Sequence, residues 1–288
     1  MFVKPHPDYG MESLEDRIGI NASATRMAVA DGMTLSYLSG PFAEAIVHKF
    51  ISDDTSLETL KNGSAFTSND VAEAWSRKVE EIELQSKGTD AGWLLQNRKK
   101  QTPHGDCTLV GIDMTQQDSV TAIAIGDCCI FFLSEEGRLL KAIPNIKVGQ
   151  FGNAPDYISS TGSIYGKICT EQISSVSGGY IVLMSDAVAE WFLKHLDEKP
   201  SSLEKIWQLK NQEEMYDFFN NEYFRRRIKG DDIAIIIVRM GSSPVAQSLP
   251  FFPRYEHLAK HLRRERLKHG VPKARGRRIL SKTKLTKI

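Results

Sequence analysis

The sequence predicts a layered sandwich in which apolar β-strands are covered on both faces. Five short runs are rich in apolar and β-branched residues and are bounded by Gly, Asp or Ser, as strands are. In the last run, residues 233–238 (IAIIIV) are apolar throughout, so both faces of that strand would be apolar. Amphipathic stretches at helical spacing lie between the runs. Such strands belong to a sandwich with another sheet or helices on each side.

In chain order, the first half predicts a strand, two helices and two further strands. ATRMAVA leads to Asp31 as a strand, and apolar residues then recur every four positions over 42–50. Capping residues at 67–70 precede an amphipathic stripe over 71–82, which predicts a second helix. The runs at 107–114 (CTLVGIDM) and 120–133 (VTAIAIGDCCIFFL) are typical of strands.

The second half predicts a long loop, a strand, two helices and a final strand. Residues 141–177 are rich in Gly, Pro, Ser and Asn, which indicates a loop that serves as a flap. GYIVLMS leads to Asp186 as a strand, and residues 187–196 and 202–219 have helical periodicity. IAIIIVRM, after Asp232, is the last strand. We expect a globular body over 1–249 and a basic tail over 250–288, partly helical and then disordered.

Four of the strand-like runs carry an Asp at or near one end. Asp31 and Asp186 follow their runs, Asp127 lies partway along its run, and Asp231 precedes its run. An antiparallel arrangement would bring these carboxylates to one rim of the sheet. They would then repel one another and take up protons, or they would hold hard divalent cations. Each Asp by itself fits ordinary turn chemistry, and only the combination favours a metal site.

The doubled carboxylate of Asp231 and Asp232 opens the most apolar strand. Successive side chains of a strand point to opposite faces, so both cannot point inward. One is a ligand candidate, and the other must find water or a backbone donor because a buried unpaired carboxylate is strongly disfavoured.

Five segments occur in the order of the motifs of the metal-dependent protein phosphatases of type 2C. These segments are EDRIGI…AVADG, HGDCTLVGI, AIAIGDCCIFFL, YIVLMSDAVAEWF and GDDIAIIIV. The similarity spans about residues 10–240. DGMTLSYLSGPFAEAIV and FGNAPDYISS resemble the divergent bacterial branch more than the eukaryotic one. Each motif is weak alone, and the ordered set is fairly specific.

The resemblance implies an α+β fold, a four-layer α-β-β-α sandwich of two antiparallel sheets flanked by helices. It also implies a centre of two Mn²⁺ or Mg²⁺ ions with a weaker third site. Carried over by position, the metal-binding residues are Asp31, the Gly32 carbonyl, Asp186, Asp231 and, at the third site, Asp127. Glu15 and Asp16 match the ED pair, which contacts the metals largely through water. Asp232 would be the outward partner of Asp231.

The activity implied is hydrolysis of phosphoserine and phosphothreonine in a protein substrate, a signalling role. A hydroxide bridging the two metals would attack phosphorus, so no protein nucleophile is required. Three departures bear on this: Met33 stands where eukaryotic members have His, no Arg precedes the ED pair, and SDG and GDS have become SDA and GDC. His104 is a weak candidate for the general acid, because a His in a loop is more often simply solvated.

Two alternatives stay open at this point. The chain could be a weak or inactive phosphatase-like sensor or scaffold that binds a partner through its tail, or it could hydrolyse a small phosphorylated metabolite. Residues 250–288 hold 13 Lys and Arg against 2 Asp and Glu, whereas the preceding residues hold 24 against 34. The tail over 254–288 could bind an acidic partner or nucleic acid, or it could be a solvated tail without a fixed partner.

The remaining features predict a cytoplasmic protein without a membrane span. The start of the chain lacks the apolar stretch of a signal peptide, and no uncharged apolar run approaches the roughly 18 residues of a transmembrane helix. The four cysteines form no C-x-x-C pair and lie mostly in apolar runs. They are expected to be buried thiols in a reducing compartment.

Overall fold

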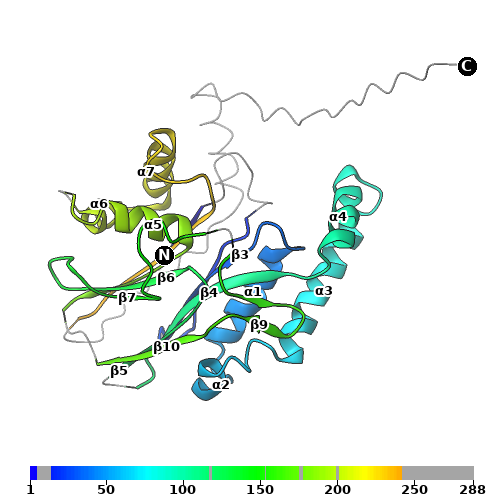
Figure 1. Ribbon diagram of the computed structural model, residues 1–288, viewed down its shortest axis with the longest axis horizontal. Helices are drawn as coiled ribbons and strands as arrows, with labels where there is room; N and C mark the ends of the chain where they lie inside the picture. The colour runs from blue at the N-terminus through cyan, green and yellow to red at the C-terminus, as the bar shows by residue number, and fades with distance from the viewer. Residues whose placement is uncertain (5–13, 117–118, 153, 175–177, 199–200, 242–288) are drawn as a thin grey trace, which may run out of the picture. The chain divides into compact units, whose positions relative to one another are not determined.

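A computed structural model describes residues 1–4, 14–116, 119–152, 154–174, 178–198 and 201–241 (Figure 1). Its strands form two sheets, and every strand pairing is antiparallel. The five-stranded sheet has the order β1 (Phe2–Lys4), β12 (Ile233–Arg239), β11 (Tyr180–Met184), β6 (Cys129–Leu133), β7 (Leu139–Ile143). The seven-stranded sheet has the order β10 (Cys169–Ser174), β5 (Ser119–Ile125), β4 (Asp106–Asp113), β3 (Arg26–Gly32), β2 (Arg17–Ile20). In addition, β8 (Tyr157–Ser159) pairs with β4, and β9 (Ser163–Tyr165) pairs with β8.

Helices cover the outer face of each sheet. On the seven-stranded sheet, α1 (Ser39–Ile51) packs on β2, β3 and β4, α3 (Asn69–Ser86) packs on α1, and α4 (Asp90–Gln101) packs on α3, with α2 (Leu57–Lys61) nearby. On the five-stranded sheet, α5 (Asp186–Lys194) contacts β12 and α7 (Gln212–Phe224) contacts β1, with α6 (Ser202–Trp207) between them in sequence. The predicted α-β-β-α order is confirmed.

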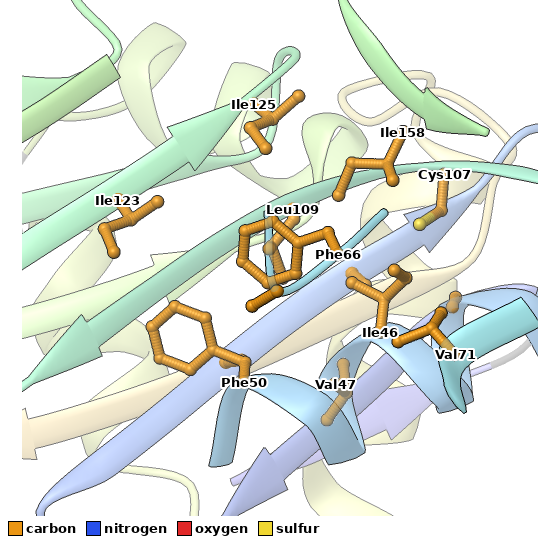
Figure 2. Packing of buried hydrophobic residues seen from close by; sticks show 14 of the residues in the cluster. Ile46, Val47, Phe50, Phe66, Val71, Cys107, Leu109, Ile123, Ile125 and Ile158 are labelled. Atoms are coloured by element: carbon orange, nitrogen blue, oxygen red, sulfur yellow. The ribbon is translucent and has the colours of Figure 1, made fainter. Parts of the chain in front are cut away.

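The alternation of side chains along the strands supplies two apolar layers. On β3, Met27 and Val29 join the cluster between the two sheets, whereas Ala28 and Ala30 face the cluster under α1. Figure 2 shows the second cluster, in which Phe50 and Phe66 lie beside strand residues such as Leu109. The small alanines of β3 let α1 approach the sheet closely. Both faces of the central strands are therefore buried, as the sequence predicts.

Three predicted segments differ in detail from the structure. The run 120–133 is two strands, β5 and β6, which belong to different sheets, so Asp127 lies in the turn between them. Residues 141–177 were expected to be one loop but contain the end of β7 and the whole of β8, β9 and β10. Residues 202–219 form the short α6 and then α7, with a break between Trp207 and Gln212.

The reason is the same for most of these differences. The strand β10 alternates half-buried and exposed residues at a sheet edge, so its sequence, CTEQIS, is polar enough to look like a loop. Its hydrogen bonds to β5 define it, and these cannot be read from composition. The helix α4 is polar for the same reason, because it packs mainly on α3.

Some predictions concern features that the fold itself does not test. The expected helix and disorder of the basic tail lie outside the described residues. No helix in the described part of the chain combines the length and apolar character needed to cross a bilayer. Cys107, Cys128 and Cys129 are buried, Cys169 is half-buried, and all four have free thiols.

Candidate active site

The acidic residues predicted from the sequence come from several chain segments that the two sheets bring together. Asp31 is the penultimate residue of β3, and Asp186 is the first residue of α5, directly after β11. Because β11 and β12 are antiparallel, the end of β11 lies beside the start of β12. Ser185 fixes this junction: its N–H donates to the Ala234 carbonyl and its Oγ accepts from the Ala234 N–H, both at 3.0 Å.

The Glu15–Asp16 segment is bound to the start of β12 through Asp232. The Oδ2 atom of Asp232 accepts the Glu15 N–H at 2.5 Å and the Asp16 N–H at 3.4 Å. Asp232 is 5% exposed, whereas the Asp231 side chain is 39% exposed. The expectation that Asp232 points outward is therefore wrong, although it does find the backbone donors that a buried carboxylate requires. Asp231 is the more accessible of the two and faces Asp186.

Two glycines allow the acidic segments to approach α1. A Cβ atom on Gly40 would lie 2.6 Å from the carbonyl oxygen of Leu14, and one on Gly32 would lie 2.9 Å from the backbone of Ser39. Neither distance is tolerable between non-bonded atoms, so both positions require glycine. At this contact Ser39 donates from its Oγ to Glu15 Oε1 at 2.7 Å, which orients the Glu15 carboxylate.

The pKa values show that the carboxylates share one electrostatic environment. Burial raises the pKa of Asp16 well above its ordinary range, and the charges of Asp232, Asp231 and Asp186 add to the effect. Burial also raises the pKa of Asp31 strongly, followed by the charges of Asp16, Asp186 and Asp231. The pKa of Asp231 is raised by burial and by Asp186, against an opposing effect of Lys229. The charges of Asp186 and Asp231 therefore both act on Asp31.

Asp127 joins this acidic centre from the turn between β5 and β6. Burial and the charge of Asp186 raise its pKa to about 6, although Lys229 acts in the opposite direction. Its side chain is buried, and Cys128 beside it contacts Thr108 Oγ1 at 3.0 Å through its Sγ. Asp127 therefore interacts electrostatically with Asp186 and Lys229.

Several buried carboxylate oxygens of the acidic centre lack hydrogen-bond partners among the described residues. They are both oxygens of Asp16, Oδ2 of Asp127 and Oδ1 of Asp186. Buried polar atoms are normally satisfied, and exceptions of this kind are typical of sites completed by an ion or water. Carboxylate oxygens are also the donors that Mg²⁺ and Mn²⁺ favour. The donor set therefore fits a divalent cation.

As the side chains stand, no three His, Cys, Asp or Glu groups in the described residues surround a single point closely enough to hold a metal ion. A lysine ammonium pairs with two of these carboxylates. Lys229 Nζ forms a hydrogen-bonded ion pair with Asp186 Oδ2 and lies 3.7 Å from Asp231 Oδ2. Burial lowers the pKa of Lys229, but the charges of Asp186, Asp231 and Asp31 outweigh it and raise the pKa above its ordinary value.

The sequence matches no protein-family model, and no curated protein matches it. Solved structures do match. PppA, described as a key regulatory component of T6SS in Pseudomonas aeruginosa, is 17% identical over 83% of this chain and 95% of its own, with a TM-score of 0.50. The Mycobacterium tuberculosis serine/threonine phosphatase PstP/Ppp is 14% identical over 83% and 96%, with a TM-score of 0.46. Stp1 from Staphylococcus aureus is 13% identical over 83% and 93%, with a TM-score of 0.47.

These structural neighbours are type 2C serine/threonine phosphatases. The chain has the type 2C phosphatase fold. The match to PppA spans most of both chains, so the fold includes both sheets and not one half of the sandwich. At these identities the likeness concerns architecture alone, and the activity has to be argued from the residues of the acidic centre.

On the type 2C fold, His104 lies outside the acidic centre but near the position of Met33. The Met33 N–H donates to the Asp106 carbonyl at 3.0 Å, and His104 Nε2 lies 3.4 Å from Asp106 Oδ2. Burial raises the pKa of Asp106, and its Oδ1 has no hydrogen-bond partner among the described residues. The structure thus pairs His104 with a carboxylate at the end of β4 that meets Asp31 and Gly32 of β3.

Two cationic residues, Lys229 and Arg98, were not predicted from the sequence. Arg98, on α4, donates to the Thr34 carbonyl, and its charge opposes the rise in the pKa of Glu15, which burial causes. The only signal in the sequence for Lys229 was its place two residues before Asp231. Arg98 offered no signal, because it reaches the ED segment only through the packing of α4 on α3.

Proposed function

We propose that the chain is a metal-dependent phosphatase that hydrolyses phosphoserine and phosphothreonine in protein substrates. The observation that supports this most is the convergence of Asp16, Asp31, Asp186 and Asp231 with unsatisfied buried oxygens on a type 2C fold. A purely structural cluster of this kind would be expected to satisfy its oxygens with protein donors. The unpaired oxygens of Asp16 and Asp186 therefore support a role in binding divalent cations.

The residues proposed to hold two Mn²⁺ or Mg²⁺ ions are Asp31, the Gly32 carbonyl, Asp186 and Asp231, with Asp127 at a weaker third site. When bound, such ions supply a nucleophile from water near neutral pH and offset charge on the phosphoryl oxygens. Asp16 is the most deeply buried of the carboxylates and has both oxygens free of partners among the described residues, so we assign it to the centre together with Glu15.

The other residues of the centre position the donors. Asp232 anchors the ED segment by accepting its backbone N–H groups, and Ser39 orients Glu15. Arg98 lies at the edge of the site, where its guanidinium could pair with a substrate phosphate in place of the Arg that the ED segment lacks. We assign proton donation to the leaving group to His104 Nε2, with Asp106 holding the ring.

The test is hydrolysis of p-nitrophenyl phosphate and of a phosphopeptide panel by the purified chain, with EDTA or Mn²⁺. Activity that requires Mn²⁺, falls in Asp31→Asn and persists in Asp70→Asn supports the proposal. Asp70 is a suitable control because it is an exposed carboxylate paired with Lys49. Preference for phosphopeptides over small phosphorylated metabolites supports the protein substrate. Absence of turnover with every divalent cation tried would contradict it.

A second candidate is a phosphatase-like sensor or scaffold without catalysis. The observation that favours it is Lys229, because a permanent ammonium at the acidic centre could neutralise the carboxylates without any metal. Metal binding without turnover, or no binding at all, would favour the scaffold. The proposal that its tail binds an acidic partner or nucleic acid concerns residues outside the described part of the chain.

A further inference from the structure

The acidic centre contains a cation that belongs to the chain itself. Lys229 Nζ is hydrogen-bonded to Asp186 Oδ2 and lies 3.7 Å from Asp231 Oδ2. These are the two carboxylates that, with Asp31, would bind one of the two divalent ions of the proposed function. An ion bound to both at about 2.1 Å would occupy the space of the ammonium. The lysine and the metal therefore exclude one another at this position.

Lys229 can leave this position without disturbing the fold. It lies outside any helix or strand, between α7 and β12, and its side chain is 37% exposed. A lysine has a flexible stem of four carbons, so its ammonium can turn towards solvent while the backbone stays in place. A residue held in a strand ladder or sealed in the core would not have this freedom.

The charges of the acidic centre allow a divalent cation to replace the Lys229 ammonium and allow the ammonium to return when the metal leaves. One ammonium interacts with the carboxylates of Asp186, Asp231 and Asp31, so the centre keeps an excess of negative charge that attracts a divalent cation. Without a metal, the ammonium pairs with Asp186, and its loss would leave the carboxylates to repel one another. The ammonium thus stabilises the metal-free protein and competes with the metal.

We propose that Lys229 is an internal counter-ion that holds the position between Asp186 and Asp231 in the metal-free protein and that a divalent cation must displace it. The inference rests on the proposed function, since it concerns the same metal centre. It makes Lys229 the residue that sets the metal affinity of this chain. The protein would stay folded without metal and become active only when the ion concentration suffices to displace the lysine.

The first experiment compares Mn²⁺ binding by the EDTA-treated full chain and its variants, with free Mn²⁺ followed by electron paramagnetic resonance. Lys229→Gln should bind Mn²⁺ on the order of tenfold more tightly, because the competing charge is gone. Lys229→Arg, which keeps the charge, should bind more weakly than Lys229→Gln. Lys49→Gln is the matched control, since Lys49 forms a 2.6 Å ion pair with Asp70 on α3.

The second measurement is the thermal unfolding of the same proteins. In EDTA, Lys229→Gln should melt below the wild type, and saturating Mn²⁺ should remove the difference. Equal or weaker Mn²⁺ binding by Lys229→Gln, or an unchanged melting temperature in EDTA, would overturn the inference. If the wild type binds Mn²⁺ and the variant does not bind it more tightly, only the role of Lys229 fails. If neither protein binds Mn²⁺, the proposed metal-dependent function fails as well.

A third measurement uses the wild type alone and does not depend on the folding of a variant. Lysine acetylation by a mild reagent, read by mass spectrometry, reports how accessible each ammonium is. Lys229 should be protected in EDTA and several-fold more reactive with saturating Mn²⁺, whereas Lys49 should not change. If Lys229 is acetylated equally or less in the presence of Mn²⁺ than in EDTA, the proposal that the metal displaces Lys229 is wrong.

Discussion

The two ends of the β3–β4 strand pair bury charge in opposite ways. At one end Arg26 lies opposite Asp113, and its Nε donates to Asp113 Oδ2 at 2.7 Å. Arg26 Nη1 also donates to the carbonyls of Ser52 and Thr55, and neither Arg26 nor Asp113 has a fully buried side-chain polar atom without a hydrogen-bond partner. At the other end Asp31 lies opposite Thr108, among carboxylates whose buried oxygens lack protein partners in the described residues.

The difference separates structure from function on a single pair of strands. A buried ion pair whose fully buried polar atoms all have protein partners supports the fold and leaves none of those atoms free for a ligand. A buried cluster of like charges with unpaired oxygens lowers the stability of the fold, and such clusters are typical of sites that bind a ligand. The comparison predicts that variants at the two ends should affect different measurements.

The largest effect is expected at the acidic end. Asp31→Asn should lower Mn²⁺-dependent hydrolysis of p-nitrophenyl phosphate on the order of a thousandfold, because it removes a proposed metal ligand. In EDTA the same variant should melt at or above the wild-type temperature, since it removes one of several repelling charges. Steady-state kinetics and thermal unfolding of one sample test both parts. A variant that loses stability and keeps activity would contradict the assignment of Asp31 to metal binding.

The opposite result is expected at the Arg26 end. Arg26→Met leaves Asp113 buried without its cation, which should lower the free energy of unfolding by about 3–5 kcal/mol. Activity per folded molecule should stay close to that of the wild type. Urea unfolding measures the first quantity, and kcat corrected for the folded fraction measures the second. A loss of kcat in fully folded protein would mean that this pair also serves the site.

A smaller effect on catalysis is expected at His104. His104→Gln should lower kcat for a phosphopeptide about a hundredfold, because a serine leaving group needs a proton. It should lower kcat much less for p-nitrophenyl phosphate, whose leaving group needs none. Unfolding should be unaffected, since the His104 side chain is 37% exposed. An equal loss with both substrates would assign His104 to binding and not to proton donation.

The smallest effect concerns pH in the metal-free protein. Burial and Asp186 raise the pKa of Asp127 to about 6 from its ordinary value of 3.8, so the folded state binds this proton more tightly than the unfolded state does. The resulting stability is complete below the ordinary pKa and is lost as the pH rises through 6. From pH 7 to pH 5 the protein should therefore gain ~1 kcal/mol from this group.

Urea unfolding in EDTA at the two pH values measures this gain, and Asp127→Asn should reduce it. A wild-type protein that loses stability from pH 7 to pH 5 by the same amount as Asp127→Asn would show that Asp127 is not part of the repelling cluster.

The sequence by itself determined the buried architecture. The sequence predicts the apolar strands β3, β4, β11 and β12 and the amphipathic helices α1 and α3, because an element buried on a face must be apolar on that face. The sequence does not predict the edge strands β2 and β10 or the helix α4, because half-exposed or exposed positions place little constraint on residue type. The acidic motifs could be predicted for another reason, because a carboxylate beside a buried strand requires a cation or a hydrogen-bond donor.

Only the tertiary structure decided how those acids are arranged and what faces them. That Asp232 anchors the ED segment while Asp231 faces Asp186 depends on how the start of β12 meets residues 14–16, which are more than two hundred positions away. The placement of Lys229 between Asp186 and Asp231, and of Arg98 near Glu15, depends equally on packing. Electrostatic interactions fall off with distance in space and not along the chain, so no local pattern could have shown them.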